Sequence, residues 1–268
     1  ARPVAAVETA PARHGAVARS TALAVMAAVM VVALAVPLAA LVREIRQSQR
    51  LAGRSVADLA SWMWPDLQST LGYALAGGLA VTVVAIPIAL FTARPRRRGA
   101  GAVEAISYLG YTLPGVTVGL AFVFVGIRLG RDYYLTPGLL ILCYAALFLP
   151  LAAGPIRAAL DGTADSLTDA ARTLGAGQWG VLFRVRLPLV LPGIAAGALL
   201  AGLTIAKELP ATLLLRPIGT QTLATHMWSL SNDSATGEAA LLGIVLVVVT
   251  ALPTALISAT LFARSERR

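Results

Sequence analysis

The sequence predicts an all-α membrane protein with about six transmembrane helices, because of its composition and its long apolar stretches. Of the 268 residues, 57% are hydrophobic and only 13% are charged, and the mean hydropathy is +0.77. A soluble domain of this size could not cover so much apolar surface. An apolar stretch of roughly 20 residues spans a bilayer as a helix. Such stretches lie at about 21–42, 70–92, 103–127, 136–156, 190–206 and 239–263.

The chain before the first apolar stretch is rich in Ala, Pro and Arg, which predicts a disordered N-terminal tail or linker over 1–20. The first stretch is too long for a cleaved signal peptide, and further spans follow it. One transmembrane domain is therefore expected over 21–263, with a short cytoplasmic tail at 264–268. The start at Ala1 fits either a whole subunit or the second half of a longer, fused chain.

The net charge of +9 comes mostly from Arg residues in the loops between spans and at the chain ends. This distribution is typical of topology signals rather than of a phosphate-binding face, so no nucleic-acid partner is expected. With the N-terminus in the cytoplasm, the inner regions carry more basic residues than the outer ones, led by the Arg94–Arg98 cluster. The basic segment Arg43–Arg54 falls outside and runs against this trend. Both termini and the loop at about 157–190 are predicted to be cytoplasmic.

This long loop is polar between apolar spans, and its residue order predicts a short capped helix. Ser166 and Asp169 make a capping-box-like start, and Gly175 and Gly177 are expected to end the helix because glycine readily adopts the left-handed C-cap conformation. A short amphipathic piece then carries Trp179, Leu182, Phe183 and Val185. Pro188 and Pro192 are expected to break it before the fifth span. On periodicity alone, an amphipathic loop lying on the membrane remains an alternative.

The string DAARTLGAGQWGVLFRVRLP in this loop resembles the EAA loop of permease subunits of ABC importers, with every spacing of that pattern kept. It differs in having Asp for Glu and Val for Ile. The resemblance implies the type I ABC importer permease fold and a coupling helix that docks in a groove of a separate ATP-binding subunit. The coupling residues it implies are Asp169, Ala170, Ala171, Gly175, Val185, Leu187 and Pro188.

A second polar constellation, Lys207-Glu208-Leu209-Pro210, lies near the outer end of the fifth span. Charges inside a span are costly and usually face a cavity or a partner, and Pro210 is expected to break or kink the helix. Such a break is tolerated where it lines water or is buried in protein. The alternative is a plain helix end, with Lys207 extending to the membrane interface.

The segment KELPATLLLRPIGTQTLATHMW resembles the corresponding segment of the ferric-iron permease subfamily. That resemblance implies ferric iron as cargo. Relatives that carry thiamine, phosphonates and polyamines share parts of the fold and the loop, so the same machinery with one of those cargoes is the alternative.

A third interruption, Leu113-Pro114-Gly115, falls inside the predicted third span. It fits either a lining of the pathway or a simple packing kink. The candidate pathway residues are therefore Lys207, Glu208, Pro210, Pro114 and Gly115. Four further glycines are expected to permit close helix packing: Gly77, Gly78, Gly193 and Gly197.

Few residues in the chain point to catalysis or to a bound metal. The only cysteine, Cys143, lies in an apolar stretch, and the two histidines, His14 and His226, are far apart in the sequence. No disulfide, metal site or catalytic residue is expected. A membrane enzyme is therefore disfavoured. An ion-coupled secondary carrier is also disfavoured, because only Glu208 and perhaps Glu104 could serve as intramembrane carboxylates.

The favoured hypothesis is a non-enzymatic permease subunit of an ATP-driven importer in the bacterial inner membrane. The chain has no Gly-rich phosphate loop with Gly-Lys-Ser/Thr, so no cofactor is expected here and ATP is expected on the partner. The expected partners are an ATP-binding subunit dimer, a second permease domain, an extracytoplasmic substrate-binding protein and the lipid bilayer. ATP binding would move the Asp169 helix and rock the spans between two states.

Overall fold

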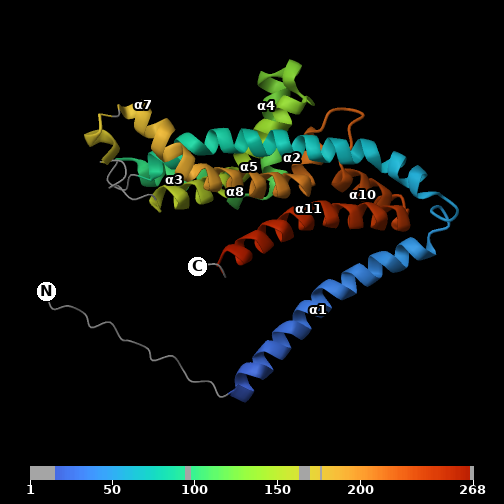
Figure 1. Ribbon diagram of the computed structural model, residues 1–268. Coiled ribbons are helices and arrows are strands. Elements are labelled where there is room, and N and C mark those ends of the chain that lie inside the picture. The colour runs from blue at the N-terminus through green and yellow to red at the C-terminus, as the bar shows by residue number, and fades with distance from the viewer. Residues whose placement is uncertain (1–15, 94–97, 163–169, 176, 266–268) are drawn as a thin grey trace.

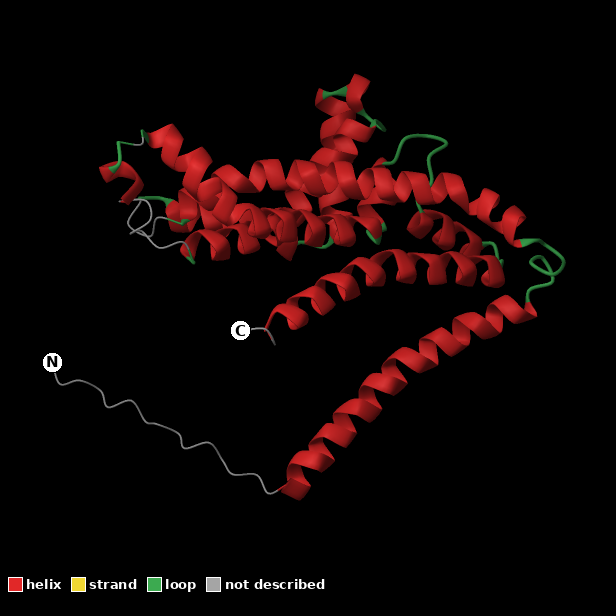
Figure 2. Ribbon diagram, viewed as in Figure 1, coloured by secondary structure: helices red, strands yellow, loops and turns green. Residues whose placement is uncertain are grey.

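The computed structural model describes residues 16–93, 98–162, 170–175 and 177–265, and within these ranges the chain is helical with no strand (Figure 2). The all-α prediction is confirmed. The named elements are α1 (Ala16–Gln47), α2 (Val56–Thr92), α3 (Ala100–Thr112), α4 (Gly115–Leu129), a 3-10 turn η1 (Arg131–Tyr133), α5 (Pro137–Asp161), α7 (Gln178–Val181), a π-helical segment η2 (Leu182–Arg186), α8 (Leu187–Ala206), α9 (Pro210–Leu215), α10 (Leu223–Asn232) and α11 (Thr236–Ser265).

Five described helical segments are long and apolar enough to cross a membrane, and a bent pair raises the number to six. The five lie at 20–47, 56–92, 137–161, 178–206 and 236–255. The bent pair is α3 and α4, and the chain direction bends by 99° at the break between them. The third predicted span, at 103–127, is therefore divided into two helices at the predicted interruption Leu113-Pro114-Gly115. The residue before a proline is pushed toward extended backbone, and Leu113 has φ −83° and ψ 146°, so α3 ends there.

Helices α2, α5 and α8 lie side by side and form the core of the bundle (Figure 1). Tyr144 and Leu140 of α5 and Val81 of α2 are fully buried between them. Glycines allow this close approach, as predicted. A Cβ on Gly78 would lie 2.8 Å from the carbonyl oxygen of Ala198, and a Cβ on Gly197 would lie 2.9 Å from that of Ala152.

Helix α2 begins at Val56, well before the start predicted near residue 70. A capping box fixes this beginning: the Ser55 hydroxyl accepts the Asp58 N–H at 3.1 Å, and the Asp58 carboxylate accepts the Ser55 N–H at 3.1 Å. The first turns of α2 are too polar to register as an apolar stretch. The helix forms because its orphan N–H groups are satisfied.

The segment between the fourth and fifth spans contains more helix than the predicted loop at 157–190. Helix α5 continues to Asp161, and Arg157 near its end pairs with Glu104 of α3. Helix resumes at Gln178 and runs without interruption to Ala206 through α7, η2 and α8. The predicted break at Pro188 and Pro192 is wrong. Pro188 lies in the first turn of α8, directly after the π-helical residues, where a missing N–H is tolerated.

Helix α1 diverges from the bundle and is exposed along its apolar length (Figure 1). It begins at Ala16, inside the segment 1–20 predicted as a tail. Its C-terminal end meets the start of α11, where Thr236 Oγ1 donates to Glu44 Oε2 at 2.8 Å. Nearby, Arg50 Nη1 lies 3.6 Å from Glu238 Oε2.

Candidate functional site

One end of the bundle, which we call the α7 end, carries a single helical turn over residues 170–173 followed by α7. The Leu174 N–H donates to the Ala170 carbonyl at 3.1 Å. Gly175 has φ +82° and donates its N–H to the Arg172 carbonyl at 2.9 Å. The prediction that Gly175 ends this helix is confirmed. A Cβ at this residue would meet no atom within 4 Å, so the backbone conformation alone demands glycine.

Gly177 has a different role from the predicted one. Its carbonyl accepts the Val181 N–H at 3.0 Å, so it starts α7 rather than ending the preceding turn. The other predicted coupling residues in the described chain are also placed. Ala170 and Ala171 form the turn, Val185 lies in η2, and Leu187 and Pro188 open α8. Asp169 and Ser166 lie outside the described residues.

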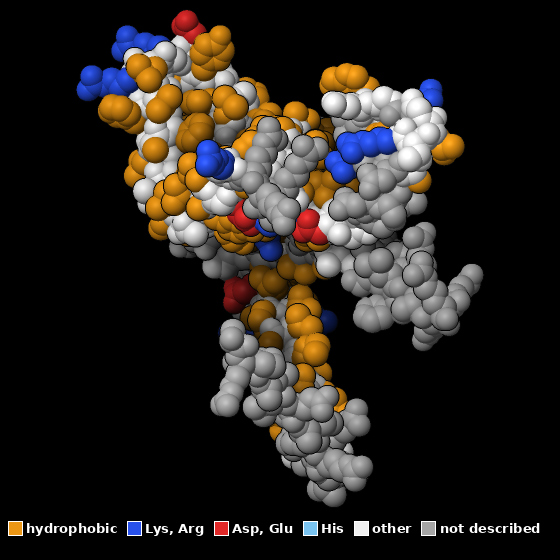
Figure 3. Space-filling view, turned by 90° about the vertical axis from the view of Figure 1, so that its left-hand side faces the viewer, with side chains coloured by type: hydrophobic (Ala, Val, Ile, Leu, Met, Phe, Trp, Pro, Cys, Tyr) orange, Lys and Arg blue, Asp and Glu red, His pale blue; other side chains and the backbone are white. Residues whose placement is uncertain are grey.

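Large apolar side chains are exposed at this end. Leu174 is 87% exposed, Trp179 is 73% exposed and Phe183 is 58% exposed. The rings of Trp179 and Phe183 stack with their centroids 6.0 Å apart. Figure 3 looks onto this end and shows hydrophobic side chains interspersed with arginines. A cluster of exposed apolar groups with a polar rim is typical of a protein-binding surface.

Within the bundle, the two predicted interruptions come together. Gly115, at the start of α4, faces the α8–α9 break: a Cβ on it would lie 3.2 Å from Glu208 Oε1. Leu113, Gly115, Lys207, Glu208 and Pro210 all line one open pocket of about 400 Å³. Pro114, the N-cap residue of α4, joins Leu113 to Gly115. Sequence reasoning had treated the two breaks separately, and the fold makes them one site.

The Glu208 carboxylate is already engaged inside the protein. Its Oε1 accepts the Ala211 N–H at 3.0 Å, and its Oε2 accepts the Thr212 N–H at 2.9 Å and the Thr212 hydroxyl at 2.6 Å. Thr212 Oγ1 in turn lies 2.7 Å from the Tyr144 hydroxyl of α5. The carboxylate therefore satisfies the first N–H groups of α9 and ties this helix to the core.

Lys207 differs from its neighbour. Its backbone closes the last turn of α8, and the residue is exposed at the pocket. Within the described part of the chain, no ion pair of Lys207 with a carboxylate is found at 4.0 Å or less. The described residues also contain no group of three or more His, Cys, Asp or Glu placed to hold a metal ion.

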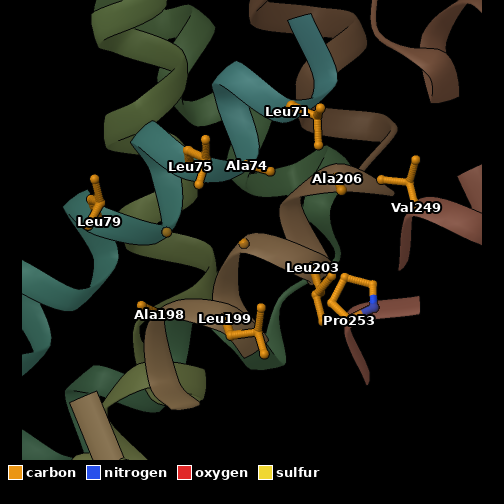
Figure 4. A pocket seen from close by; sticks show the side chains of 12 residues that line it. Leu71, Ala74, Leu75, Leu79, Ala198, Leu199, Leu203, Ala206, Val249 and Pro253 are labelled. Carbon is orange, nitrogen blue, oxygen red and sulfur yellow. The ribbon is translucent and has the colours of Figure 1, made fainter. Parts of the chain in front are cut away.

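A second cavity, of about 320 Å³, lies between α2, α8 and α11 and is almost entirely apolar (Figure 4). Leu71, Leu75 and Leu79 of α2 face Leu203 of α8 and Pro253 of α11 across it. With no charged group in its wall, it is a poor candidate for passage of an ion. The pocket at the α8–α9 break is the better candidate.

Sequence reasoning missed one polar pair. His226 of α10, for which the sequence analysis named no role, lies against Asp66 of α2. Asp66 is buried in α2, a predominantly apolar helix. A carboxylate within such a helix needs a polar partner, and this is the one signal in the sequence that could have indicated the pair.

The model of the family described as "Binding-protein-dependent transport system inner membrane component" matches residues 85–268. The Fe(3+)-transport system permease protein FbpB 2 of Haemophilus influenzae is 30% identical over 66% of this chain. The matched part covers only 35% of the length of that relative. The molybdenum transport system permease protein ModB of Escherichia coli K12 is 31% identical over 70% of this chain and 91% of the relative.

Solved structures share the fold. The structure of a bacterial ABC transporter involved in import of the acidic polysaccharide alginate matches 92% of this chain and 95% of its own, with a TM-score of 0.65 at 19% identity. A bacterial alginate transporter in complex with an alginate-bound periplasmic protein matches 87% of this chain and 91% of its own, with a TM-score of 0.60 at 19% identity. The predicted type I ABC importer permease fold is confirmed.

Proposed function

The chain belongs to the family of binding-protein-dependent transport system inner membrane components, and we propose that it forms half of the membrane pathway of an ATP-driven importer for a small ion. It is an ABC importer permease, a multi-pass inner-membrane protein. In the proposal, ATP is bound and hydrolysed on a separate subunit, and this chain supplies the path and the coupling surface.

The observation that carries the coupling role is the α7 end. A helical turn ended by a left-handed Gly175 projects beside exposed Leu174, Trp179 and Phe183. An apolar surface of this kind is suited to a groove on another protein. It connects directly to a transmembrane helix, because α7 continues through η2 into α8. Movement of a docked ATPase would therefore act on the spans.

The α7 end is proposed to face the cytoplasm, with both termini on that side. The arginines of the loop after α2 and of the C-terminal tail support this orientation through the positive-inside rule. The opposite end, with α10 and the α1–α2 turn, would receive cargo from an extracytoplasmic binding protein. A second permease domain, from a copy of this chain or a related one, would supply the other half of the pathway.

Two cargoes are proposed. Ferric iron is supported by the Lys207–Trp228 segment and by the 30% identity to FbpB 2. Molybdate, an oxyanion, is supported by the 31% identity to ModB over nearly the whole length of that relative.

The test is copurification of this chain with its ATP-binding subunit and its binding protein, followed by ATPase assays of the assembled complex. Cargo should stimulate ATP hydrolysis only when the binding protein is present. Failure of the chain to bind any ATP-binding subunit would refute the proposed function.

A further inference from the structure

A chain of three side chains leads from the core of the bundle to the pocket at the α8–α9 break. The hydroxyl of Tyr144 on α5 lies 2.7 Å from Thr212 Oγ1, which lies 2.6 Å from Glu208 Oε2. Glu208 lines the pocket, whereas neither Tyr144 nor Thr212 is among the described residues that line it. Tyr144 is therefore connected to the pocket through Glu208 without reaching it.

The direction of these hydrogen bonds follows from the number of protons available. Both oxygens of the Glu208 carboxylate accept backbone N–H groups, those of Ala211 and Thr212, so the carboxylate is an acceptor. The Thr212 hydroxyl has a single proton. Its oxygen lies 2.6 Å from Glu208 Oε2 and 3.0 Å from the Glu208 carbonyl oxygen, and the shorter contact with the charged oxygen is the stronger one. Thr212 therefore donates to Glu208, and Tyr144 donates to Thr212.

Packing alone does not account for the two hydroxyl groups. Tyr144 and Thr212 are both fully buried, and a hydroxyl is costly to bury unless it is hydrogen-bonded. Phe and Val would fill nearly the same space, and replacing both members of a buried hydrogen-bonded pair by apolar groups of the same shape costs little stability. The pair is better explained by its effect on Glu208, because hydrogen bonds in a chain polarise and strengthen one another.

The Glu208 carboxylate is also confined on its other side, by α4. A Cβ on Gly115 would lie 3.2 Å from Glu208 Oε1, and a Cβ on Gly119 would lie 3.2 Å from the Cα of Ala211 in α9. Glu208 is thus held between α4 and α9, and a change of its rotamer would break its three hydrogen bonds to α9. Its position in the pocket wall depends on the Thr212 hydroxyl, and through that hydroxyl on Tyr144.

We propose that Tyr144 is a positioning residue for transport, which acts through Thr212 to fix the Glu208 carboxylate in the wall of the pocket. The inference rests on the proposed function, because it takes this pocket as part of the pathway. It concerns where the carboxylate is held, and it applies equally to both proposed cargoes.

The experiment uses the complete importer in proteoliposomes, with its ATPase, its second permease domain and its binding protein. ATP-driven uptake of sodium molybdate and of ferric chloride is measured, and each rate is divided by the amount of copurified ATPase. Tyr144→Phe should lower uptake of the transported probe about threefold to tenfold, the effect of one lost hydrogen bond, with ATPase copurification unchanged. Absence of uptake of both probes by the unmodified importer would instead refute the proposed function, and with it this role.

Variants of Thr212 test the second link of the chain. Thr212→Val keeps the shape and removes the hydroxyl, so it should lower uptake at least as much as Tyr144→Phe. Thr212→Ser should restore most of the uptake, because the hydroxyl returns. Thr82→Val is the matched control: the buried Thr82 hydroxyl donates to the Gly78 carbonyl of its own helix at 2.7 Å, and its loss should leave uptake unchanged.

A second series separates positioning from a purely structural role. In the Glu208→Gln importer, whose remaining uptake is the reference, Tyr144→Phe should cause no further loss, because the carboxylate that it positions is gone. Tyr134→Phe is the control and should be neutral in both backgrounds. Tyr134 also packs against the core, and no hydrogen bond of its hydroxyl is found within the described part of the chain.

Two outcomes would contradict the role of Tyr144. Normal uptake by Tyr144→Phe would show that its hydroxyl is not needed. The same fold loss from Tyr144→Phe with Glu208 and with Gln at that position would show that Tyr144 acts on the packing of the bundle and not through the carboxylate. In both cases intact ATP-driven uptake by the unmodified importer would leave the proposed function standing.

Discussion

The Nδ1 atom of His226 lies 2.5 Å from the Oδ2 atom of Asp66, so a polar pair joins α10 to α2. The side chains of His226 and Asp66 are 18% and 9% exposed, and the ring centroids of Trp62 and His226 are 5.3 Å apart. A second contact reinforces the junction: the Leu223 N–H donates to Thr70 Oγ1 at 2.8 Å. These two polar contacts, together with apolar packing, therefore hold α10 on the bundle.

Replacing His226 by Ala should lower the free energy of unfolding by about 2–3 kcal/mol, because it leaves the Asp66 carboxylate buried without its partner. Thermal or denaturant unfolding in detergent measures this loss. The Asp66→Ala/His226→Ala double variant should be less destabilised than the sum of the two single variants. Strict additivity would show that the two side chains do not interact in solution.

Gly78→Val should destabilise the bundle by about 1–3 kcal/mol, the usual range for an overpacked interface. The new Cβ would lie 2.8 Å from a backbone carbonyl oxygen of α8, which cannot rotate away. Gly72→Val is the matched control on the same helix, because its Cβ would meet no atom within 4 Å. Similar unfolding midpoints for the two variants would contradict close packing at Gly78.

Gly175→Asp should reduce association with the ATPase and ATP-driven uptake, because L-residues are strained at a φ of +82°. Gly177→Asp adds the same charge two residues away, at the start of α7, where Asp is a good N-cap. Copurification and uptake are measured for both variants. If the two behave alike, charge rather than the left-handed backbone would be responsible.

Trp179→Glu should leave the thermal stability of the chain nearly unchanged, because the side chain is 73% exposed. It should weaken binding of the ATPase about tenfold or more, because an apolar anchor is lost from the proposed interface. Ile218→Glu is the control, since Ile218 is 89% exposed in the loop between α9 and α10. Binding of the ATPase to detergent-solubilised chain is the measurement. Normal binding by Trp179→Glu would show that this residue does not belong to the proposed docking surface.

Glu208→Gln should lower the free energy of unfolding by about 1–2 kcal/mol and reduce transport, while ATPase copurification is retained. A neutral amide replaces the charge-assisted bonds to the Ala211 and Thr212 N–H groups with weaker ones. Unfolding, uptake and copurification are compared in one preparation. Loss of all three together would indicate a general folding defect instead.

The apolar stretches and the Gly175 turn could be predicted because each depends on local chemistry. A long run of apolar residues forms a span wherever it lies, and a left-handed helix end favours glycine. The same reasoning failed at Pro188, where a π-helical segment absorbs the missing N–H, and at Gly177, whose carbonyl opens the next helix. These outcomes depend on backbone geometry that residue types alone do not specify.

The candidate site was predicted in parts but not as a whole. Lys207 and Gly115 were each recognised from a break in an apolar stretch. Their meeting depends on the 99° bend between α3 and α4 and on the packing of α4 against α9, which are tertiary features. The pairing of His226 with Asp66 joins residues 160 positions apart. Sequence patterns predict contacts only between residues that are close in the chain.

The unbroken helix from Gln178 to Ala206 can act as a lever for the surface at the α7 end. Its 29 residues extend over roughly 43 Å at about 1.5 Å per residue, from the stacked rings of Trp179 and Phe183 to the turn that carries Lys207. A tilt of about 10° around its midpoint displaces each end by roughly 4 Å in opposite directions. In the proposed coupling, a push on the α7 end would move the wall of the pocket in the opposite direction.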